Sequence, residues 1–172
     1  MHIQEKRYNT QLAGEYFVAG ELFRQEFFAN VSFGNAKSFD ILVFSEDESK
    51  FARIEVKSSN DPYFTRKKPP IYKDDHKFHF NIEALSKEIQ ENKDSTNKFY
   101  VFVALNGKDN KPDFFIAEAK RVYNVMKKKI DICKKEGKKV SGRWDIKLSD
   151  IFRNKNSEKK NDWNVLREFF KK

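Results

Sequence analysis

The chain is poor in cysteine and has no long hydrophobic segment. Its 172 residues include one cysteine, Cys133, which excludes an internal disulfide and any metal site built from several cysteines. No apolar run approaches the roughly 20 residues that a membrane-spanning helix needs. Residues 1–7 lack the apolar core of a secretory signal. We therefore expect a cytoplasmic protein with no membrane partner.

Several familiar catalytic motifs are also missing. The sequence has no glycine-rich phosphate loop, no Ser-His-Asp combination, no zinc-ligand spacing and no internal repeat. Hydrophobic residues make up only 38% of the chain, but 18 phenylalanines compensate because each can bury a large area. A length of 172 residues is sufficient for a sizeable core, and we expect a single domain over 1–172.

The net charge of +9 is unevenly distributed. Residues 1–117 contain 17 Lys and Arg against 18 Asp and Glu, a balance of −1. Residues 118–172 contain 18 against 8, a balance of +10. A strongly basic C-terminal third suits a protein that binds polyanionic nucleic acid. Basic, solvated helices are the ordinary alternative.

Two apolar segments rich in Val, Ile and Phe, residues 38–44 and 51–58, predict a β-hairpin, because the residues between them are all polar. Alternation along the second segment places Glu55 and Lys57 on one face. Asp40, on the first segment, can converge with them. Two carboxylates and an amine in this arrangement can hold a divalent cation and activate a water molecule. A hairpin with a solvated charged face is the alternative.

Upstream, residues 10–30 predict a helix with an apolar stripe. The stripe consists of Leu12, Tyr16, Ala19, Leu22, Phe23 and Phe27. Glu15 falls inside the stripe, whereas Glu21 falls on the opposite, solvent side. A buried carboxylate is costly unless it is paired, so Glu15 needs a function or a lysine partner. Glu26 also lies near the stripe, and which of Glu15 and Glu26 is the acid of the site stays open.

Downstream, residues 97–105 form a continuous apolar run, typical of a strand that is buried on both faces. Before it, Ile82, Leu85 and Ile89 recur at helical spacing behind Asn81, a favourable N-cap residue. The hairpin, this helix and the buried strand predict a β-α-β unit with parallel strands.

Asp40 followed by Glu55-Val56-Lys57 resembles the signature of the PD-(D/E)XK nuclease superfamily, an acid on one strand and acid-x-Lys on the next. The order of elements over residues 10–105 is similar to the core of this restriction-endonuclease-like fold. The resemblance implies an α/β protein with a mixed β-sheet flanked by helices. It implies a core in the order α-β-β-β-α-β, with C-terminal helical additions.

The resemblance also implies a function. The chain would be a Mg²⁺-dependent endonuclease that cleaves DNA, of a restriction-like or repair type. Mn²⁺ could replace Mg²⁺. Asp40, Glu55 and the backbone carbonyl of Val56 would hold the metal, and Lys57 would assist the water. Glu15 matches the acid of the family's first helix. Relatives often act as homodimers, since cutting two strands needs two sites. A Holliday-junction-resolvase-like nuclease and a catalytically silent nucleic-acid-binding module are the alternatives.

Residues 58–80 predict a long loop that follows Lys57, because paired prolines end any regular element. We expect four of its residues to contact phosphates or stack on bases, unless the loop is a simple surface insertion. They are Arg66, Lys67, Lys68 and Tyr72. His76 and His79 are interpreted as loop residues, because nothing nearby completes a transition-metal site; contact with nucleic acid is the alternative.

The C-terminal third predicts alternating strands and helices. Residues 114–117 predict a strand, and 118–136 predict a helix that ends at Gly137. Within this helix, Lys127 and Lys128 are candidates for contact with a phosphate backbone, although a solvated face is the default interpretation. A short strand over 144–148 and an amphipathic helix over 162–170 are expected to complete the fold.

Overall fold

A computed structural model of the chain describes residues 3–32, 39–60, 77–91, 95–105, 111–152 and 160–171. The helices are α1 (Ile3–Arg24), α2 (Ile82–Glu91), α3 (Ala119–Lys135), α4 (Leu148–Phe152) and α5 (Asn164–Lys171), with a 3₁₀ turn η1 (Ser95–Asn97). The strands are β1 (Phe28–Val31), β2 (Ile41–Phe44), β3 (Phe51–Ser59), β4 (Lys77–Asn81), β5 (Lys98–Ala104), β6 (Asp113–Glu118) and β7 (Arg143–Lys147).

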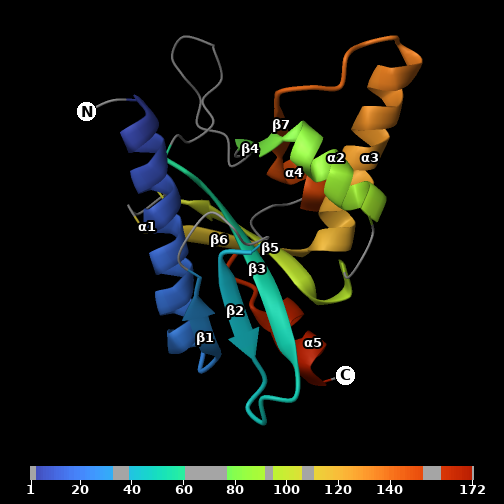
Figure 1. Ribbon diagram of the computed structural model, residues 1–172. Coiled ribbons are helices and arrows are strands. Elements are labelled where there is room, and N and C mark those ends of the chain that lie inside the picture. Colours follow the sequence, from blue (N-terminus) through green and yellow to red (C-terminus); the bar gives the residue numbers. More distant parts are fainter. Residues whose placement is uncertain are drawn as a thin grey trace.

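Five strands form a mixed main sheet in the order β1-β2-β3-β5-β6 (Figure 1). The pairs β1–β2, β2–β3 and β5–β6 are antiparallel, whereas β3 and β5 are parallel. The predicted hairpin and the predicted β-α-β unit are therefore confirmed. The mixed sheet with flanking helices is the fold class that was expected, and α1, β1, β2, β3, α2 and β5 follow the order α-β-β-β-α-β.

Helices cover both faces of the main sheet. Alternate residues of β5 point to opposite sides, so that Phe99 and Val101 pack with α1 and α5, while Tyr100 and Phe102 pack with α2 and α3. All seven residues of β5 are buried, as the apolar run predicted. Each fully buried large apolar side chain stabilises the fold by about 1.5–3 kcal/mol. Figure 1 shows α1 on one side of the strands and α2 and α3 on the other.

Local capping signals place the ends of two helices correctly. The Asn81 side-chain oxygen accepts hydrogen bonds from the backbone N–H groups of Glu83 (3.0 Å) and Ala84 (3.1 Å), which caps α2 as expected. At the end of α3, Gly137 has a φ of 67°, the left-handed conformation that glycine adopts without strain. None of the helices that the structure describes has both the length and the apolar character needed to cross a bilayer.

The first helix differs from its prediction in both extent and orientation. It begins at Ile3 and ends at Arg24, and residues 28–31 form β1 instead of a last helical turn. Two members of the predicted stripe, Tyr16 and Phe23, are each 56% exposed. Ala19 and Leu22 of the predicted stripe are buried as expected, but the buried face also contains Gly14 and Val18, which the stripe did not include.

Close approach of α1 to β3 at Gly14 explains this rotation. A Cβ atom at Gly14 would lie only 2.5 Å from the Ser58 Cβ, so the side of the helix without a side chain must face the sheet. The prediction that Glu21 faces solvent was also wrong. Its side chain is 14% exposed and accepts hydrogen bonds from Arg24 and Gln25.

The long loop predicted over residues 58–80 is shorter than expected at both ends. Strand β3 continues through Ser59, and residues 77–81 form β4, which pairs with β7 in a separate two-stranded sheet. His79 therefore lies on a strand and not in a loop. The strand forms because Phe78 and Phe80 alternate with polar residues and are buried against β5. Residues 61–76, including His76, lie outside the described residues.

Candidate active site

Asp40 lies immediately before β2 and is held against β3. Its backbone N–H donates to the Ile54 carbonyl (2.8 Å), and its Oδ2 accepts from the Val56 backbone N–H (2.7 Å). The hairpin ladder ends at the pair Ile41–Ile54, so Asp40 follows it next to Glu55, and the two carboxylates are close enough for their charges to interact. Burial, followed by the charge of Glu55, raises the pKa of Asp40, although the Val56 N–H and Lys57 act in the opposite direction.

Glu55 is held between two ammonium groups. Its Oε1 lies 2.5 Å from the Lys57 Nζ, and its Oε2 lies 2.7 Å from the Lys98 Nζ. Burial on its own would raise the pKa of Glu55, but the positive charges of Lys57 and Lys98 outweigh burial and lower the pKa. Glu55 is therefore a fixed carboxylate. The Lys57 ammonium also lies 5.8 Å from the centre of the Phe80 ring on β4.

Glu15 joins the cluster from α1. The Gln11 side-chain N–H₂ group donates both to Glu15 Oε1 (3.0 Å) and to the Val56 backbone carbonyl (3.0 Å). This amide links helix and strand and fixes the position of the Glu15 carboxylate. Burial raises the pKa of Glu15 and repulsion by Asp40 adds to the effect, while the Gln11 hydrogen bond and Lys57 oppose it.

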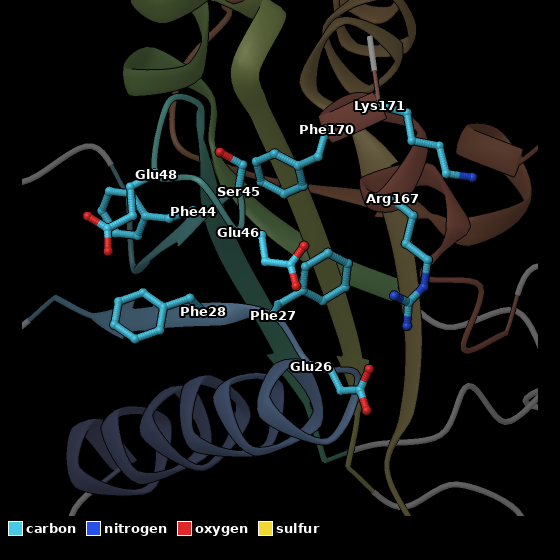
Figure 2. Close-up of a pocket in the computed structure, with 10 residues that line it drawn as sticks. All are labelled: Glu26, Phe27, Phe28, Phe44, Ser45, Glu46, Glu48, Arg167, Phe170 and Lys171. Atoms are coloured by element: carbon cyan, nitrogen blue, oxygen red, sulfur yellow. The ribbon is translucent and has the colours of Figure 1, made fainter.

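Glu26 lies elsewhere. It follows the end of α1 and lines a cavity of about 630 Å³ next to the β2–β3 turn, together with Phe27, Phe28, Glu46 and residues of α5 (Figure 2). This cavity lies at the Phe44 end of β2, whereas Asp40 precedes the other end of that strand. Of the two acids left open by the sequence, the structure therefore brings Glu15, and not Glu26, close to Asp40 and Lys57.

A buried extension of the cluster was missed in the sequence. Lys98 has a side chain only 4% exposed, and it is the one buried charged residue among those described. Besides Glu55, it pairs with Glu88 of α2, and Glu88 accepts a hydrogen bond from the Tyr123 hydroxyl (2.6 Å). Burial and the Glu88 carboxylate raise the pKa of Tyr123 well above its ordinary value. The only sign of this buried pairing in the sequence was a lysine, Lys98, within the otherwise apolar run 97–105.

The donor atoms suit a hard divalent cation. Asp40 and Glu55 offer carboxylate oxygens from adjacent strands, and Mg²⁺ typically uses one or two carboxylates and keeps several waters. The Val56 carbonyl, expected as a further ligand, already accepts the Gln11 hydrogen bond. In the part of the chain that the structure describes, no three His, Cys, Asp or Glu side chains form a ready-made metal cluster. The types of donor atom present therefore fit Mg²⁺, with two carboxylates as protein ligands and water in the other coordination positions.

The chain is structurally similar to two nucleases. One is a bacterial homing endonuclease, with a TM-score of 0.45 and 12% identity, covering 97% of this chain and 93% of the other. The second is a nuclease from a fusselovirus, with a TM-score of 0.44 and 10% identity, covering 99% of this chain and 93% of the other. No family model and no curated protein sequence matches the chain. Likenesses this distant do not show which reaction the chain catalyses.

The predicted nucleic-acid contacts are only partly described. Arg66, Lys67, Lys68 and Tyr72 lie outside the described residues. Lys127 and Lys128 are exposed on α3, whose opposite side packs on the main sheet. His79 pairs with Asp145 across the β4–β7 sheet, so its neighbour is a carboxylate and not a set of metal ligands.

Proposed function

We propose that this chain is a divalent-metal-dependent nuclease that hydrolyses phosphodiester bonds in DNA. One observation carries the proposal. Asp40 and Glu55 come together where the hairpin ladder ends, close enough for their charges to interact, with the Lys57 ammonium 2.5 Å from Glu55. Glu15 is close enough to Asp40 for repulsion between the two carboxylates to raise the pKa of Glu15. Phosphodiester hydrolysis needs charge neutralisation and an activated water, and these residue types supply both requirements.

Asp40 and Glu55 would hold Mg²⁺ or Mn²⁺, with Glu15 and the Val56 carbonyl as further oxygen donors. When bound, the cation neutralises phosphate charge and lowers the pKa of a water molecule that it coordinates. The chain prepares this site before any ligand arrives. The Val56 N–H fixes one oxygen of Asp40, and Gln11 fixes one oxygen of Glu15. The second oxygen of each carboxylate has no hydrogen-bond partner among the described residues.

Lys57 is the cationic group of the proposed reaction. Its ammonium is a donor of three hydrogen bonds, and one of them goes to Glu55 Oε1. The remaining two N–H groups can orient an attacking water or stabilise the charge that develops on a phosphoryl oxygen. Lys98 has a different task, because it is buried behind Glu55. It holds Glu55 Oε2 and so keeps that carboxylate ionised and oriented.

Cleavage of supercoiled plasmid and of four-way branched DNA tests the proposal. The wild type, Lys57→Ala and Glu55→Gln are each incubated with Mg²⁺, with Mn²⁺ and with a chelator. We expect the wild type to nick or linearise DNA only with metal, and both variants to lose activity by about 100-fold or more. Lys135→Ala, an exposed change at the end of α3, is the matched control and should cleave like the wild type.

Two outcomes would contradict the proposal. Cleavage that persists in chelator, or in Lys57→Ala, would exclude the assigned residues. DNA binding that is equal in all proteins and indifferent to metal, with no cleavage of either substrate, would instead identify a silent binding module. A preference for branched over plasmid DNA would place the chain among structure-specific nucleases.

A further inference from the structure

A polar groove adjoins Lys57 on the side away from the buried Lys98. Its volume is about 520 Å³, and it lies between the N-terminal half of α1 and the β4–β7 sheet, with the end of β3 at its base. Five of its lining residues are basic or can become so. They are Lys6 and Arg7 on α1, Lys57 on β3, His79 on β4 and Arg143 on β7.

The charge of this groove is of one sign. Among the described residues that line it, none is acidic, and the others are Thr, Gln, Ser and Asn side chains, which offer further hydrogen bonds. Lys6, Arg7 and Arg143 are exposed, and within the described residues none of them has a carboxylate partner. The nearby acid Asp145 is paired with His79. Uncompensated cations that converge on a groove attract a polyanion.

Regular elements hold the walls of the groove in place. The Ser58 hydroxyl donates to the Thr10 carbonyl (2.8 Å), and the Asn60 amide donates to the Thr10 hydroxyl (2.8 Å), so α1 is fixed to the end of β3. On the other wall, Arg143 lies opposite Asn81 in the β4–β7 ladder. The backbones that carry the cations are therefore positioned before a ligand binds, which limits the entropy lost on binding.

We propose that this groove binds the sugar-phosphate backbone of a DNA strand immediately beside the bond to be cleaved. The inference rests on the proposed function and deepens it. Lys and Arg side chains contact phosphates without reading sequence, so the groove supplies affinity and register, not recognition of particular bases. The strand would run from the proposed active site, past Lys57, between Lys6 and Arg7 on one side and Arg143 on the other.

The sequence made Lys127 and Lys128 on α3 candidates for phosphate contact. A variant of α3 with the same loss of charge is therefore the matched comparison for a variant of the groove. One triple variant is Lys6→Gln/Arg7→Gln/Arg143→Gln in the groove, and the other is Lys120→Gln/Lys127→Gln/Lys128→Gln on α3. Both remove three positive charges from exposed positions, and glutamine preserves helix propensity at the five positions that lie on α1 and α3. Urea unfolding of both variants checks that each one is folded before binding is measured.

Binding is measured by fluorescence anisotropy with labelled duplex and single-stranded DNA in chelator, where metal-dependent cleavage cannot proceed. Salt is varied between about 50 and 200 mM. We expect the groove variant to bind at least about tenfold more weakly, and the slope of log K against log salt to fall by about 2 to 3, because each lost phosphate contact removes about 0.9. The α3 variant should change both quantities far less.

Equal weakening in the two triple variants would overturn the inference, since only overall charge would then matter. Wild-type affinity and slope in the groove variant would overturn it as well. Failure of the catalytic proposal is separable from these results. If the wild type cleaves no DNA but the groove variant alone loses affinity, the groove binds DNA and the nuclease proposal fails. If the wild type cleaves, the groove variant should raise KM and leave kcat within about threefold of the wild type.

Discussion

Lys98 is a single buried ammonium between two carboxylates, Glu55 and Glu88. A buried charge is tolerated only when it is paired and hydrogen-bonded, and here both conditions hold. The position of the Glu55 carboxylate in the site therefore depends on Lys98, a residue that is too deeply buried to contact a substrate. The network continues to Tyr123 through Glu88, so the site is supported from α3 as well as from the sheet.

We predict that Lys98→Met destabilises the fold by about 1–3 kcal/mol, since it leaves the partly buried carboxylates of Glu88 and Glu55 without this counter-charge. Urea unfolding with a chelator present measures this change. Lys127→Met, an exposed change of the same kind on α3, should stay within about 0.5 kcal/mol of the wild type.

A double-mutant cycle identifies the cause. Glu88→Gln should cost much less in the Lys98→Met background than in the wild type, with a coupling energy of about 1–3 kcal/mol. A Lys98→Met protein as stable as the wild type would show that this buried pairing contributes nothing to stability.

The residues of the site differ in how far the sequence could place them. Asp40, Glu55 and Lys57 were predictable as neighbours, because strand alternation and hairpin register depend on local sequence. Glu15 was a candidate only because a carboxylate interrupted an apolar pattern. Lys98 was not identified, because a lysine inside an apolar run has no local sign of the partners that neutralise it, and these lie on β3 and α2.

At the scale of elements, the packing of α1 on β3 positions Glu15 and Gln11. We predict that Gly14→Ala destabilises the protein by about 1–3 kcal/mol, because the new methyl group would lie 2.5 Å from the Ser58 Cβ and push the helix away from the strand. It should also reduce cleavage, since Gln11 and Glu15 move with the helix. Urea unfolding and the plasmid assay measure the two effects.

Gly20→Ala in the same helix is the matched control. Among the described residues, no atom outside the helix's own backbone lies within 4 Å of a Cβ at Gly20, and its substitution should stabilise the helix by about 0.4–1 kcal/mol. If both alanine variants behaved alike, close contact at Gly14 would not explain the orientation of α1.

The short helix α4 depends on Asp150. Its Oδ2 lies 2.7 Å from the Lys129 Nζ and accepts from the Lys147 backbone N–H at the helix start. Burial would raise the pKa of Asp150, but the hydrogen bond and charge of Lys129 outweigh it and lower the pKa below its ordinary value of 3.8. A lowered pKa contributes stability above the ordinary value, and this contribution is lost as pH falls through the folded-state pKa.

We therefore predict that Asp150→Asn lowers the free energy of unfolding at neutral pH by less than about 1 kcal/mol, since the pair is partly exposed. The difference from the wild type should shrink as the pH falls below about 3.8. Asp131→Asn, exposed on the neighbouring α3, should change stability little at any pH. An Asp150 effect that grew on acidification would contradict the assigned direction of the pKa.

Elements with local signals were predictable, and elements that depend on distant partners were not. Asn81 marks the start of α2 and Gly137 marks the end of α3, and each signal involves only residues adjacent in the sequence. Strand β4 was not predicted, because it pairs with β7, which lies more than sixty residues further along the chain. Likewise, residues 28–31 follow directly on the apolar pattern that ends at Phe27, so 28–30 were predicted as helix. Residues 28–31 form a strand because they pair with β2.

At the scale of the whole molecule, charged residues that are far apart in the sequence gather on the same surface of the fold. The proposed catalytic carboxylates and the basic groove adjoin one end of β3, and the groove combines cations from α1, β3 and β7. The cavity next to the β2–β3 turn, at the opposite end of β2, has a mixed lining of three acids and two cations (Figure 2). They are Glu26, Glu46, Glu48, Arg167 and Lys171. Of the cations that line the proposed DNA groove, only Arg143 belongs to the strongly basic last third of the chain.

The most direct measurement compares cleavage and stability in one variant, Asp40→Asn. The asparagine oxygen can still accept the Val56 N–H, and a neutral group suits this site because burial raises the pKa of Asp40. Plasmid cleavage with Mg²⁺ and thermal unfolding with and without Mg²⁺ are recorded on the same preparations of wild type and variant.

The account predicts that Asp40→Asn loses cleavage by about 100-fold or more, while its stability in chelator equals or exceeds that of the wild type by up to about 1 kcal/mol. Mg²⁺ should raise the melting temperature of the wild type and not that of the variant, because only the wild type keeps the binding carboxylate. Wild-type cleavage by Asp40→Asn, or equal stabilisation of both proteins by Mg²⁺, would contradict a metal-dependent nuclease site at this end of the sheet.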